Sequence, residues 1–271
     1  WSSSCVECYQ KWETAENWQR EYNDSGISVI GVHVPEFAFH RTPESLSKTL
    51  DDWKISIPVV ADVEGRTAEV YSAKKFPFFV VLDTDGFIRF TGSGAEGAGL
   101  AEEVFRGVLV EHAELQGTKT TLPARAPEQV VNPFDAAKSK NLYLGSEYGR
   151  KDFGNPQGLR QGFVMNYTLP ITPTAMKAYV SGEWRANADN VELEGVAGQL
   201  FVVSDARKIS LIAGSRENST VSVFVDEILS HKFSVKEFKI YDVLELQSYS
   251  VHEVRLDIES QGMFLYKLAL Q

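Results

Sequence analysis

The chain opens with Trp1-Ser2-Ser3-Ser4-Cys5-Val6-Glu7-Cys8, a stretch that contains both of its cysteines. Residues 9–22 contain no Gly or Pro, and their aromatic residues recur at helical spacing. This pattern predicts a helix directly after Cys8, with Cys5 at its N-terminus. Because the unpaired N–H groups and the dipole at that end of a helix favour an anion, we expect a stabilised thiolate on Cys5.

Three interpretations of the cysteine pair follow from its spacing. A redox-active disulfide is favoured, since thiols at this spacing can close a small ring and a C-x-x-C ahead of an α/β pattern is typical of redox proteins. A zinc site needs more ligands, but no second C-x-x-C exists and the five histidines lack paired spacing, so we predict no metal. An inert structural disulfide is disfavoured, because so short a loop gives the smallest entropic gain. We expect no cofactor besides the disulfide.

The composition allows two ordinary domains, with 271 residues of which 43% are hydrophobic. No apolar run approaches the roughly 20 residues that a membrane helix needs, and no signal peptide is recognisable. Residues 1–116 hold 10 basic and 19 acidic residues, a balance of −9, whereas residues 117–271 have a balance of −1. The acidic first half repels phosphate backbones, so nucleic acid is not an expected partner.

The first half shows an alternating α/β pattern. Thr42 is predicted to cap a helix that has Pro43 at its first position, and Thr84-Asp85-Gly86 predicts a hairpin turn. The glycine-rich stretch Gly92–Gly99 is interpreted as a connecting loop and not as a phosphate cradle, since it follows a hairpin and lacks a Lys-Ser/Thr pair. Strands are predicted at 27–34, 75–83 and 87–90, a short strand or extended stretch at 57–62, and further helices at 43–53, 67–72 and 100–115.

This order of elements resembles the extracytoplasmic thioredoxin-like domain of the DipZ family, in the TlpA/ResA branch. The residues that carry the resemblance are Trp1-(x)3-Cys5-x-x-Cys8, Val29–Glu36, Phe76-Pro77 and Val81-Leu82-Asp83-x-Asp85-Gly86. In that family the domain follows a membrane electron-transfer domain of the CcdA/DsbD type and precedes a carbohydrate-binding-like β-sandwich. The resemblance implies an α/β thioredoxin-like fold over residues 1–116. Since no strand precedes the cysteines, we expect that the fold lacks its first strand in this chain, and that the N-terminal part of a longer protein is missing.

The resemblance also implies roles for individual residues. Cys5 corresponds to the attacking cysteine and Cys8 to the resolving one. Glu36 matches the active-site glutamate of the TlpA/ResA branch, where a carboxylate takes the proton of the resolving thiol. The alternative for Glu36 is an ordinary glutamate on a surface loop.

Substrate binding is implied for Trp1, Phe76 and Pro77. Pro77 corresponds to the cis proline of the fold, although the sequence by itself shows only a proline at the start of a strand. Val6-Glu7 between the cysteines departs from common thioredoxins. The charge of Glu7 disfavours the neighbouring thiolate, which gives a more reducing couple and favours a reductase over an oxidase.

The resemblance therefore implies an extracytoplasmic thiol–disulfide oxidoreductase, membrane-tethered in its full-length form. It is expected to reduce disulfide-bearing exported proteins or apocytochrome c and to be recharged by a membrane electron donor of the CcdA/DsbD type. The alternative is a glycan- or protein-binding module in which the cysteine pair is not catalytic.

The second half is predicted to be all β. Residues 117–140 are polar and contain prolines, which favours a linker, and alternating segments over residues 141–271 indicate an antiparallel, jelly-roll-like sandwich. A glycan ligand is one interpretation, because four aromatic residues of this half are candidates to stack on sugar rings: Tyr143, Tyr148, Trp184 and Tyr249. A structural or protein-docking role is favoured, since aromatic residues in strands more often pack in the core. Strands are predicted at 177–185, 199–203, 208–213, 220–226, 252–258 and 262–270, with a turn at Asp226-Glu227.

Overall fold

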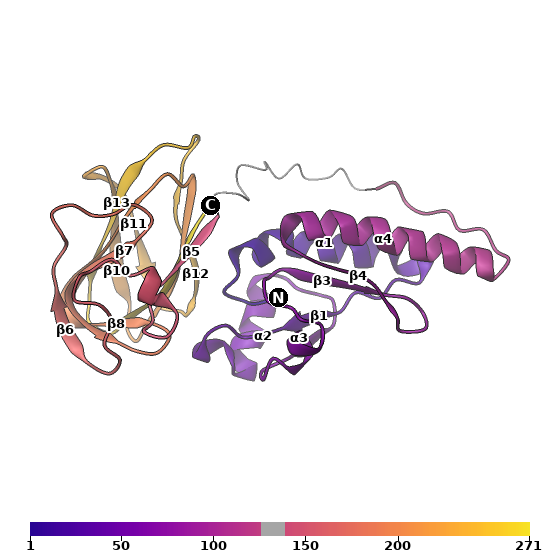
Figure 1. The fold of residues 1–271 in the computed structure, drawn as a ribbon, viewed down its shortest axis with the longest axis horizontal. Coiled ribbons are helices and arrows are strands. Elements are labelled where there is room, and N and C mark those ends of the chain that lie inside the picture. Colours follow the sequence, from indigo (N-terminus) through magenta and orange to yellow (C-terminus); the bar gives the residue numbers. More distant parts are fainter. Residues whose placement is uncertain (126–138) are drawn as a thin grey trace. The chain divides into compact units, whose positions relative to one another are not determined.

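A computed structural model describes residues 1–125 and 139–271 of the chain (Figure 1). The chain divides into two compact units, Trp1–Val131 and Asn132–Gln271. Part of the predicted linker, residues 126–138, lies outside the described residues, and the domain limits at 116 and 141 stay a prediction. No helix in the described part of the chain is long and apolar enough to cross a membrane.

The first unit has the predicted α/β order. Strands β1 and β2 pair in parallel, with Gly31 opposite Val59, and β3 and β4 form an antiparallel hairpin. Each predicted helix and strand of this unit is present, though the strands are mostly shorter than predicted. The elements are α1 (Val6–Tyr22), η1 (Asn23–Ser25), β1 (Gly31–His33), η2 (Ala38–His40), α2 (Pro43–Asp52), β2 (Val59–Ala61), α3 (Arg66–Val70), β3 (Phe78–Leu82), β4 (Ile88–Ser93) and α4 (Gly94–Leu115).

Local sequence signals determine where two of these elements begin and turn. The Thr42 hydroxyl accepts a hydrogen bond from the Ser45 N–H at 3.2 Å and so caps α2, with Pro43 at the first helical position, as predicted. Between β3 and β4 the chain turns at Gly86, whose φ of +85° suits a residue without a Cβ. Both devices are local, which is why the sequence reveals them.

The prediction of a loop at Gly92–Gly99 is wrong for most of its length, because α4 begins at Gly94 and not at Leu100. The cause is close packing between the first turn of the helix and the hairpin. A Cβ on Gly97 would lie 2.9 Å from the carbonyl carbon of Gly92, so glycine here permits contact between two backbones. Ala98, one residue further on, is buried. The glycines serve tertiary packing, and helix propensity is overridden.

Helices α1 and α4 are joined by a buried polar network. Glu102 on α4 is 6% exposed and accepts hydrogen bonds from the Tyr22 hydroxyl at 2.9 Å and from Trp18 Nε1 at 3.2 Å. Arg106 donates to the same hydroxyl and to the Pro123 carbonyl. Burial, and then the hydrogen bond to Glu102, raise the pKa of Tyr22 above its usual value. This network fixes the helix that carries the cysteines.

The second unit is an antiparallel, curled sheet of ten strands. The prediction of an antiparallel all-β domain is confirmed; the strands form one continuously hydrogen-bonded sheet, and the jelly-roll arrangement stays a prediction. The order is β11-β10-β13-β8-β14-β9-β12, with β5 on β14, β7 on β8 and β6 on β7. The elements are β5 (Lys140–Tyr143), η3 (Gly149–Lys151), β6 (Val164–Tyr167), β7 (Ala178–Ala186), β8 (Val191–Ser204), β9 (Lys208–Ser215), β10 (Ser219–Val225), β11 (Ile228–Val235), β12 (Lys239–Glu245), β13 (His252–Glu259) and β14 (Met263–Leu270).

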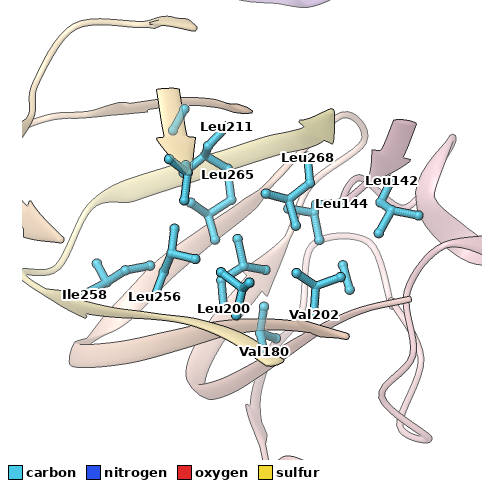
Figure 2. Packing of buried hydrophobic residues seen from close by; sticks show 14 of the residues in the cluster. Leu142, Leu144, Val180, Leu200, Val202, Leu211, Leu256, Ile258, Leu265 and Leu268 are labelled. Atoms are coloured by element: carbon cyan, nitrogen blue, oxygen red, sulfur yellow. The ribbon is translucent and has the colours of Figure 1, made fainter. Parts of the chain in front are cut away.

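The core of this unit lies inside the curl of the sheet (Figure 2). Inward side chains alternate along the strands, as period-two patterning requires. Those shown include Leu142, Leu144, Val180, Leu200, Val202, Leu211, Leu256, Ile258, Leu265 and Leu268, and each is at most 1% exposed. The strands with the most apolar inward faces were predicted from the sequence. β5, β6, β11, β12 and the first half of β8 were not predicted.

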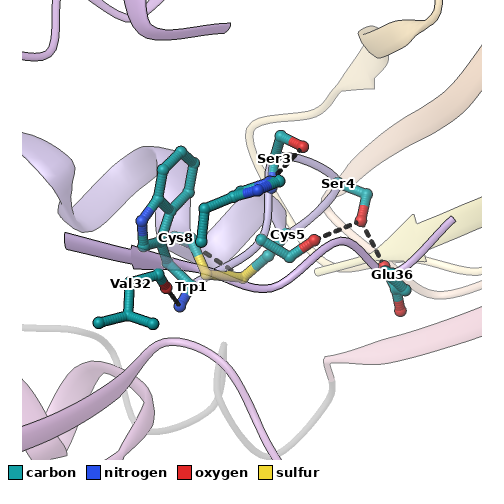
Figure 3. Close-up of a disulfide and its surroundings, with 9 residues drawn as sticks. Trp1, Ser3, Ser4, Cys5, Cys8, Val32 and Glu36 are labelled. Carbon is teal, nitrogen blue, oxygen red and sulfur yellow. Dashed lines mark hydrogen bonds between the residues drawn. A yellow bond between two sulfur atoms is a disulfide. The ribbon is translucent and has the colours of Figure 1, made fainter. Parts of the chain in front are cut away.

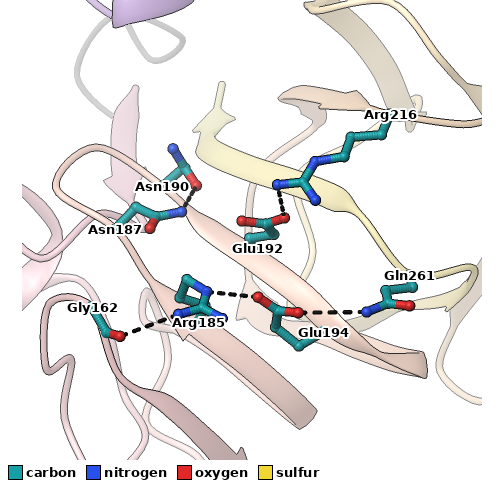
Figure 4. A network of polar contacts seen from close by, with 8 residues as sticks. All are labelled: Gly162, Arg185, Asn187, Asn190, Glu192, Glu194, Arg216 and Gln261. Atoms are coloured by element: carbon teal, nitrogen blue, oxygen red, sulfur yellow. Dashed lines mark hydrogen bonds and ion pairs between the residues drawn. The ribbon is translucent and has the colours of Figure 1, made fainter.

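Polar pairs lie along β7 and β8, as Figure 4 shows. Arg185 Nε donates to Glu194 at 2.6 Å, and Arg216 donates to Glu192 at 2.6 Å. Glu192 is 5% exposed, so its charge is balanced by a partner that reaches solvent. Hydrogen bonds from Arg185 to the Gly162 carbonyl and between Asn187 and Asn190 extend this network, and all of these contacts support the sheet.

Candidate functional site

The two cysteines form a disulfide at the N-terminus of α1, with their Cα atoms 5.1 Å apart (Figure 3). Cys5 is the N-cap residue and is half-buried, whereas Cys8 lies in the first turn and is 2% exposed. Cys5 Sγ accepts a hydrogen bond from the Cys8 N–H at 3.0 Å. Cys5 is therefore the sulfur that a macromolecule can reach, and a backbone donor and the helix dipole would stabilise its thiolate after reduction.

The serines before Cys5 connect it to Glu36. The Ser4 hydroxyl donates to Glu36 Oε2 at 2.5 Å and lies 3.0 Å from the Ser2 hydroxyl. Ser4 is fully buried, whereas Glu36, in the loop after β1, is half-buried. Figure 3 shows the carboxylate directed toward the segment that carries Cys5. The structure thus brings Glu36 next to the cysteine motif, through a serine that the sequence did not single out.

His33 is a second buried group at the site. Its Nε2 accepts from the Ser3 N–H at 3.3 Å and lies 2.9 Å from the Ser3 hydroxyl, and its ring packs on Trp1 at 4.6 Å. Burial lowers the pKa of His33 to about 4. The ring is therefore neutral at physiological pH. The sequence signal that could have identified His33 as a buried histidine is its position between two valines in a predicted buried strand.

Aromatic side chains pack beneath the disulfide. The ring centroid of Trp1 lies 4.6 Å from that of Trp12 and 5.4 Å from that of Trp53. Cys8 packs in the same cluster. Phe76 packs against the same cluster, so two of the predicted substrate-binding residues, Trp1 and Phe76, lie close to the cysteines. Trp1 is only 8% exposed, so its ring supports the site from below more than it forms its surface.

The bond between Phe76 and Pro77 is cis, as expected from the resemblance. Pro77 is buried, and its carbonyl accepts from the Gly94 N–H at 2.8 Å, which joins the start of β3 to the start of α4. The contact of Phe76 with the disulfide cluster is thus fixed by the fold. The roles in substrate binding stay a prediction.

In the second unit one of the four sugar-stacking candidates is wrong. Trp184 is fully buried and donates its indole N–H to the Ser181 carbonyl at 2.8 Å, so no face of its ring is free for a sugar. Tyr148 is 59% exposed, and Tyr143 and Tyr249 are half-buried with the cationic side chains of Lys267 and Arg207 over their rings. The second unit also contains a hollow of about 470 Å³. It is lined by Arg150, Phe153, Gly158, Leu159, Arg160 and Gln161.

Comparison with known proteins finds a family match for the second unit and a similarity to the DipZ proteins across both units. Residues 139–269 match the family described as thioredoxin like C-terminal domain. Protein DipZ of Mycobacterium bovis is 26% identical over 255 residues, which cover 88% of this chain and 36% of that protein; DipZ of Mycobacterium tuberculosis gives the same figures. The thioredoxin-like protein SkfH of Bacillus subtilis is 28% identical over 88 residues, 32% of this chain and 60% of that protein.

Among solved structures, an oxidised thioredoxin-like protein in solution covers 41% of this chain and 74% of its own, with 24% identity and a TM-score of 0.38. The chain spans about a third of the length of the curated DipZ proteins that it matches. The match across both units, together with a C-x-x-C disulfide at the start of a helix in an α/β unit, identifies this chain as a DipZ-like protein with a thioredoxin-like domain.

Proposed function

We propose that this chain is an extracytoplasmic thiol–disulfide oxidoreductase that reduces protein disulfides, with Cys5 as the attacking and Cys8 as the resolving cysteine. The observation that carries the proposal is the asymmetry of the pair: Cys5 is half-buried at the N-cap of α1, and Cys8 is 2% exposed. Attack on a target needs access and a thiolate, whereas resolution needs only proximity to the first sulfur.

The reaction proceeds by two thiol–disulfide exchanges. The Cys5 thiolate attacks one sulfur of the target disulfide, whose S–S bond breaks, and the other sulfur leaves as a thiolate. Cys8 loses its proton to Glu36 and attacks Cys5 in the mixed disulfide. The Cys5–Cys8 bond then forms, the target leaves as a dithiol, and two electrons have passed to it. The contact between Ser4 and Glu36 supports this role, since it holds a carboxylate beside the motif.

The targets we propose are exported proteins with disulfides, apocytochrome c among them, which reach Cys5 beside the half-buried Phe76. The buried Trp1 and Pro77 would support this surface from within. A membrane electron donor of the CcdA/DsbD type would restore the dithiol. The DipZ likeness supports an extracytoplasmic location. Both partners follow from the family resemblance of the sequence.

Paired cysteine variants test the proposal with the reduced full chain and insulin as the disulfide substrate. Cys5→Ser is expected to abolish reduction, because the cysteine that remains, Cys8, is 2% exposed and is not accessible to a target disulfide. Cys8→Ser is expected to accumulate a mixed disulfide with Cys5, visible on a non-reducing gel. Undiminished reduction by Cys5→Ser would contradict the proposal. For a reductase, the Cys5–Cys8 couple is expected to have a reduction potential of about −270 mV. A potential of about −120 mV would mean that the chain oxidises its targets instead.

A second candidate function, glycan binding by the sheet unit, is favoured by the hollow between Arg150 and Arg160. Its volume of about 470 Å³ lies in the range of small-ligand sites. The half-buried Leu159 offers apolar surface for a pyranose ring, and the guanidinium groups favour an acidic sugar. Chemical-shift changes are expected with glucuronate and weaker ones with glucose, and Arg160→Gln should reduce the difference. No shift with either sugar would remove this candidate.

A further inference from the structure

Three side chains of the second unit form a hydrogen-bonded chain at one edge of the sheet. Ser250 Oγ lies 2.6 Å from His252 Nε2, and His252 Nδ1 lies 2.6 Å from Asp226 Oδ2. Asp226 comes from the turn between β10 and β11. Ser250 and His252 are two positions apart, Ser250 in the segment after β12 and His252 at the first position of β13. A serine, a histidine and a carboxylate in this order are the groups that activate a hydroxyl nucleophile.

The backbone around Asp226 fixes the carboxylate. Asp226 and Glu227 have φ values of +49° and +65°, so both residues adopt the left-handed region in a tight hairpin turn. Asp226 Oδ1 accepts from the Glu253 N–H at 2.9 Å, and the Asp226 N–H donates to the Glu253 carbonyl at 2.9 Å. Asp226 Oδ1 is therefore held by the backbone of β13, and Asp226 Oδ2 faces the imidazole of His252.

The position of the His252 imidazole is fixed by the sheet and by Asp226. His252 begins β13 and lies opposite Ser204 of β8 in the sheet register. Its hydrogen bond to Asp226, followed by the Glu253 N–H, lowers the pKa of that carboxyl, so Asp226 is ionised near neutral pH and acts as an acceptor. A proton on Nδ1 then satisfies Asp226, and the lone pair of Nε2 faces the Ser250 hydroxyl. In this tautomer the imidazole is the base for Ser250.

The serine is accessible. Ser250 is exposed, and its neighbour Val251 is 68% exposed, so a small reagent reaches the hydroxyl from solvent and finds an apolar side chain beside it. His252 is less open, with 24% of its side chain exposed. An open site of this kind encloses no large substrate, which limits it to small acyl groups on good leaving groups.

We propose that Ser250 is a nucleophile for acyl transfer, with His252 as its base and Asp226 as the residue that positions the base, and that its substrates are small activated esters. This activity is separate from the redox chemistry of the first unit. Ser250 Oγ attacks the carbonyl carbon and forms a new C–O bond, while the bond to the leaving alcohol breaks. His252 Nε2 takes the serine proton and passes it to the leaving oxygen. Water then cleaves the acyl-serine, which releases a carboxylic acid and restores the hydroxyl.

The chain contains a matched internal control. Ser230 and His231 on β11 form another exposed Ser–His pair, with Ser230 Oγ 3.2 Å from His231 Nδ1. Within the described part of the chain, no carboxylate contacts His231. The two serines therefore differ in the third member of the chain, and their relative reactivity isolates its effect.

The experiment uses the oxidised full chain, in which both thiols are blocked, with p-nitrophenyl acetate as the probe. Site-resolved mass spectrometry measures acetylation at each serine over time. We expect Ser250 to be acetylated about 100-fold faster than Ser230, the low end of what a positioned base contributes. His252→Gln is expected to bring the rate at Ser250 down to that of Ser230, and Asp226→Asn to lower it in part. Ser250→Ala should leave acetylation elsewhere unchanged.

Equal acetylation of Ser250 and Ser230 in the wild-type chain would overturn the proposal, and that comparison needs no variant. An unchanged rate in a folded His252→Gln variant would overturn it as well. Circular dichroism of each variant verifies folding. Since the readout is ester chemistry in the oxidised protein, its outcome is independent of whether the cysteines reduce disulfides.

Discussion

Glu102 allows a prediction whose magnitude follows from its contacts. Glu102→Ala removes the acceptor of two buried donors, the Tyr22 hydroxyl at 2.9 Å and Trp18 Nε1 at 3.2 Å. Leaving a buried donor unsatisfied costs about 1–3 kcal/mol. Trp18 is 7% exposed and Tyr22 fully buried, so water replaces Glu102 poorly at either donor. Two such losses predict a decrease of about 4 kcal/mol in the free energy of unfolding of the first unit.

Urea unfolding followed by tryptophan fluorescence measures this loss. Four of the five tryptophans lie in the first unit, so the signal reports mainly on it. Glu103→Ala is the matched control, because Glu103 is the neighbouring glutamate on α4 and is exposed, and its change should stay within about 0.5 kcal/mol. Glu102→Gln keeps one carbonyl acceptor and should cost less than Glu102→Ala.

A loss below about 1 kcal/mol for Glu102→Ala, or one equal to that of Glu103→Ala, would refute the reasoning. It would mean that the two donors find other acceptors and that the network does not hold α1 against α4. A loss of the expected size in a variant that still reduces disulfides once folded would separate the support of α1 from the chemistry at its N-terminus.

Three further outcomes are expected. Glu36→Gln should slow resolution of the mixed disulfide by about 100-fold, because the amide takes no proton, with little change in stability since it still accepts from Ser4; an unchanged rate in stopped-flow kinetics would exclude Glu36 as the base. Burial lowers the pKa of His33 from 6.5 to about 4, so the unfolded chain binds the proton at a higher pH than the folded chain. Roughly 3 kcal/mol of stability is therefore lost as the pH falls from 6.5 toward 4. In urea titrations at several pH values, His33→Gln should lack this dependence of stability on pH. Trp184→Ala should cost the second unit about 3–5 kcal/mol by calorimetry, and a smaller loss would mean that the sheet closes around the cavity.

Much of the first unit was predictable because its signals are local. The cap at Thr42 and the turn at Gly86 depend on neighbours within a few residues. The cysteine pair also predicts its own surroundings, since its spacing and the helix that follows put Cys5 at a helix N-terminus. Predictions that failed, such as the loop in place of the first turns of α4, depend on a contact that sequence spacing does not encode.

The sequence alone determined the α/β order of the first unit, the all-β character of the second and the identity of the cysteine pair, because periodicity, caps and motif spacing act over short distances. Only the tertiary structure decided that Ser4 holds Glu36 across 32 positions, that Glu102 ties α4 to α1 and that Ser250, His252 and Asp226 meet at one edge of the sheet. It also decided that Trp184 is buried. Side-chain meetings of this kind depend on sheet register and helix packing, which many distant residues set together, so no short stretch of sequence contains them.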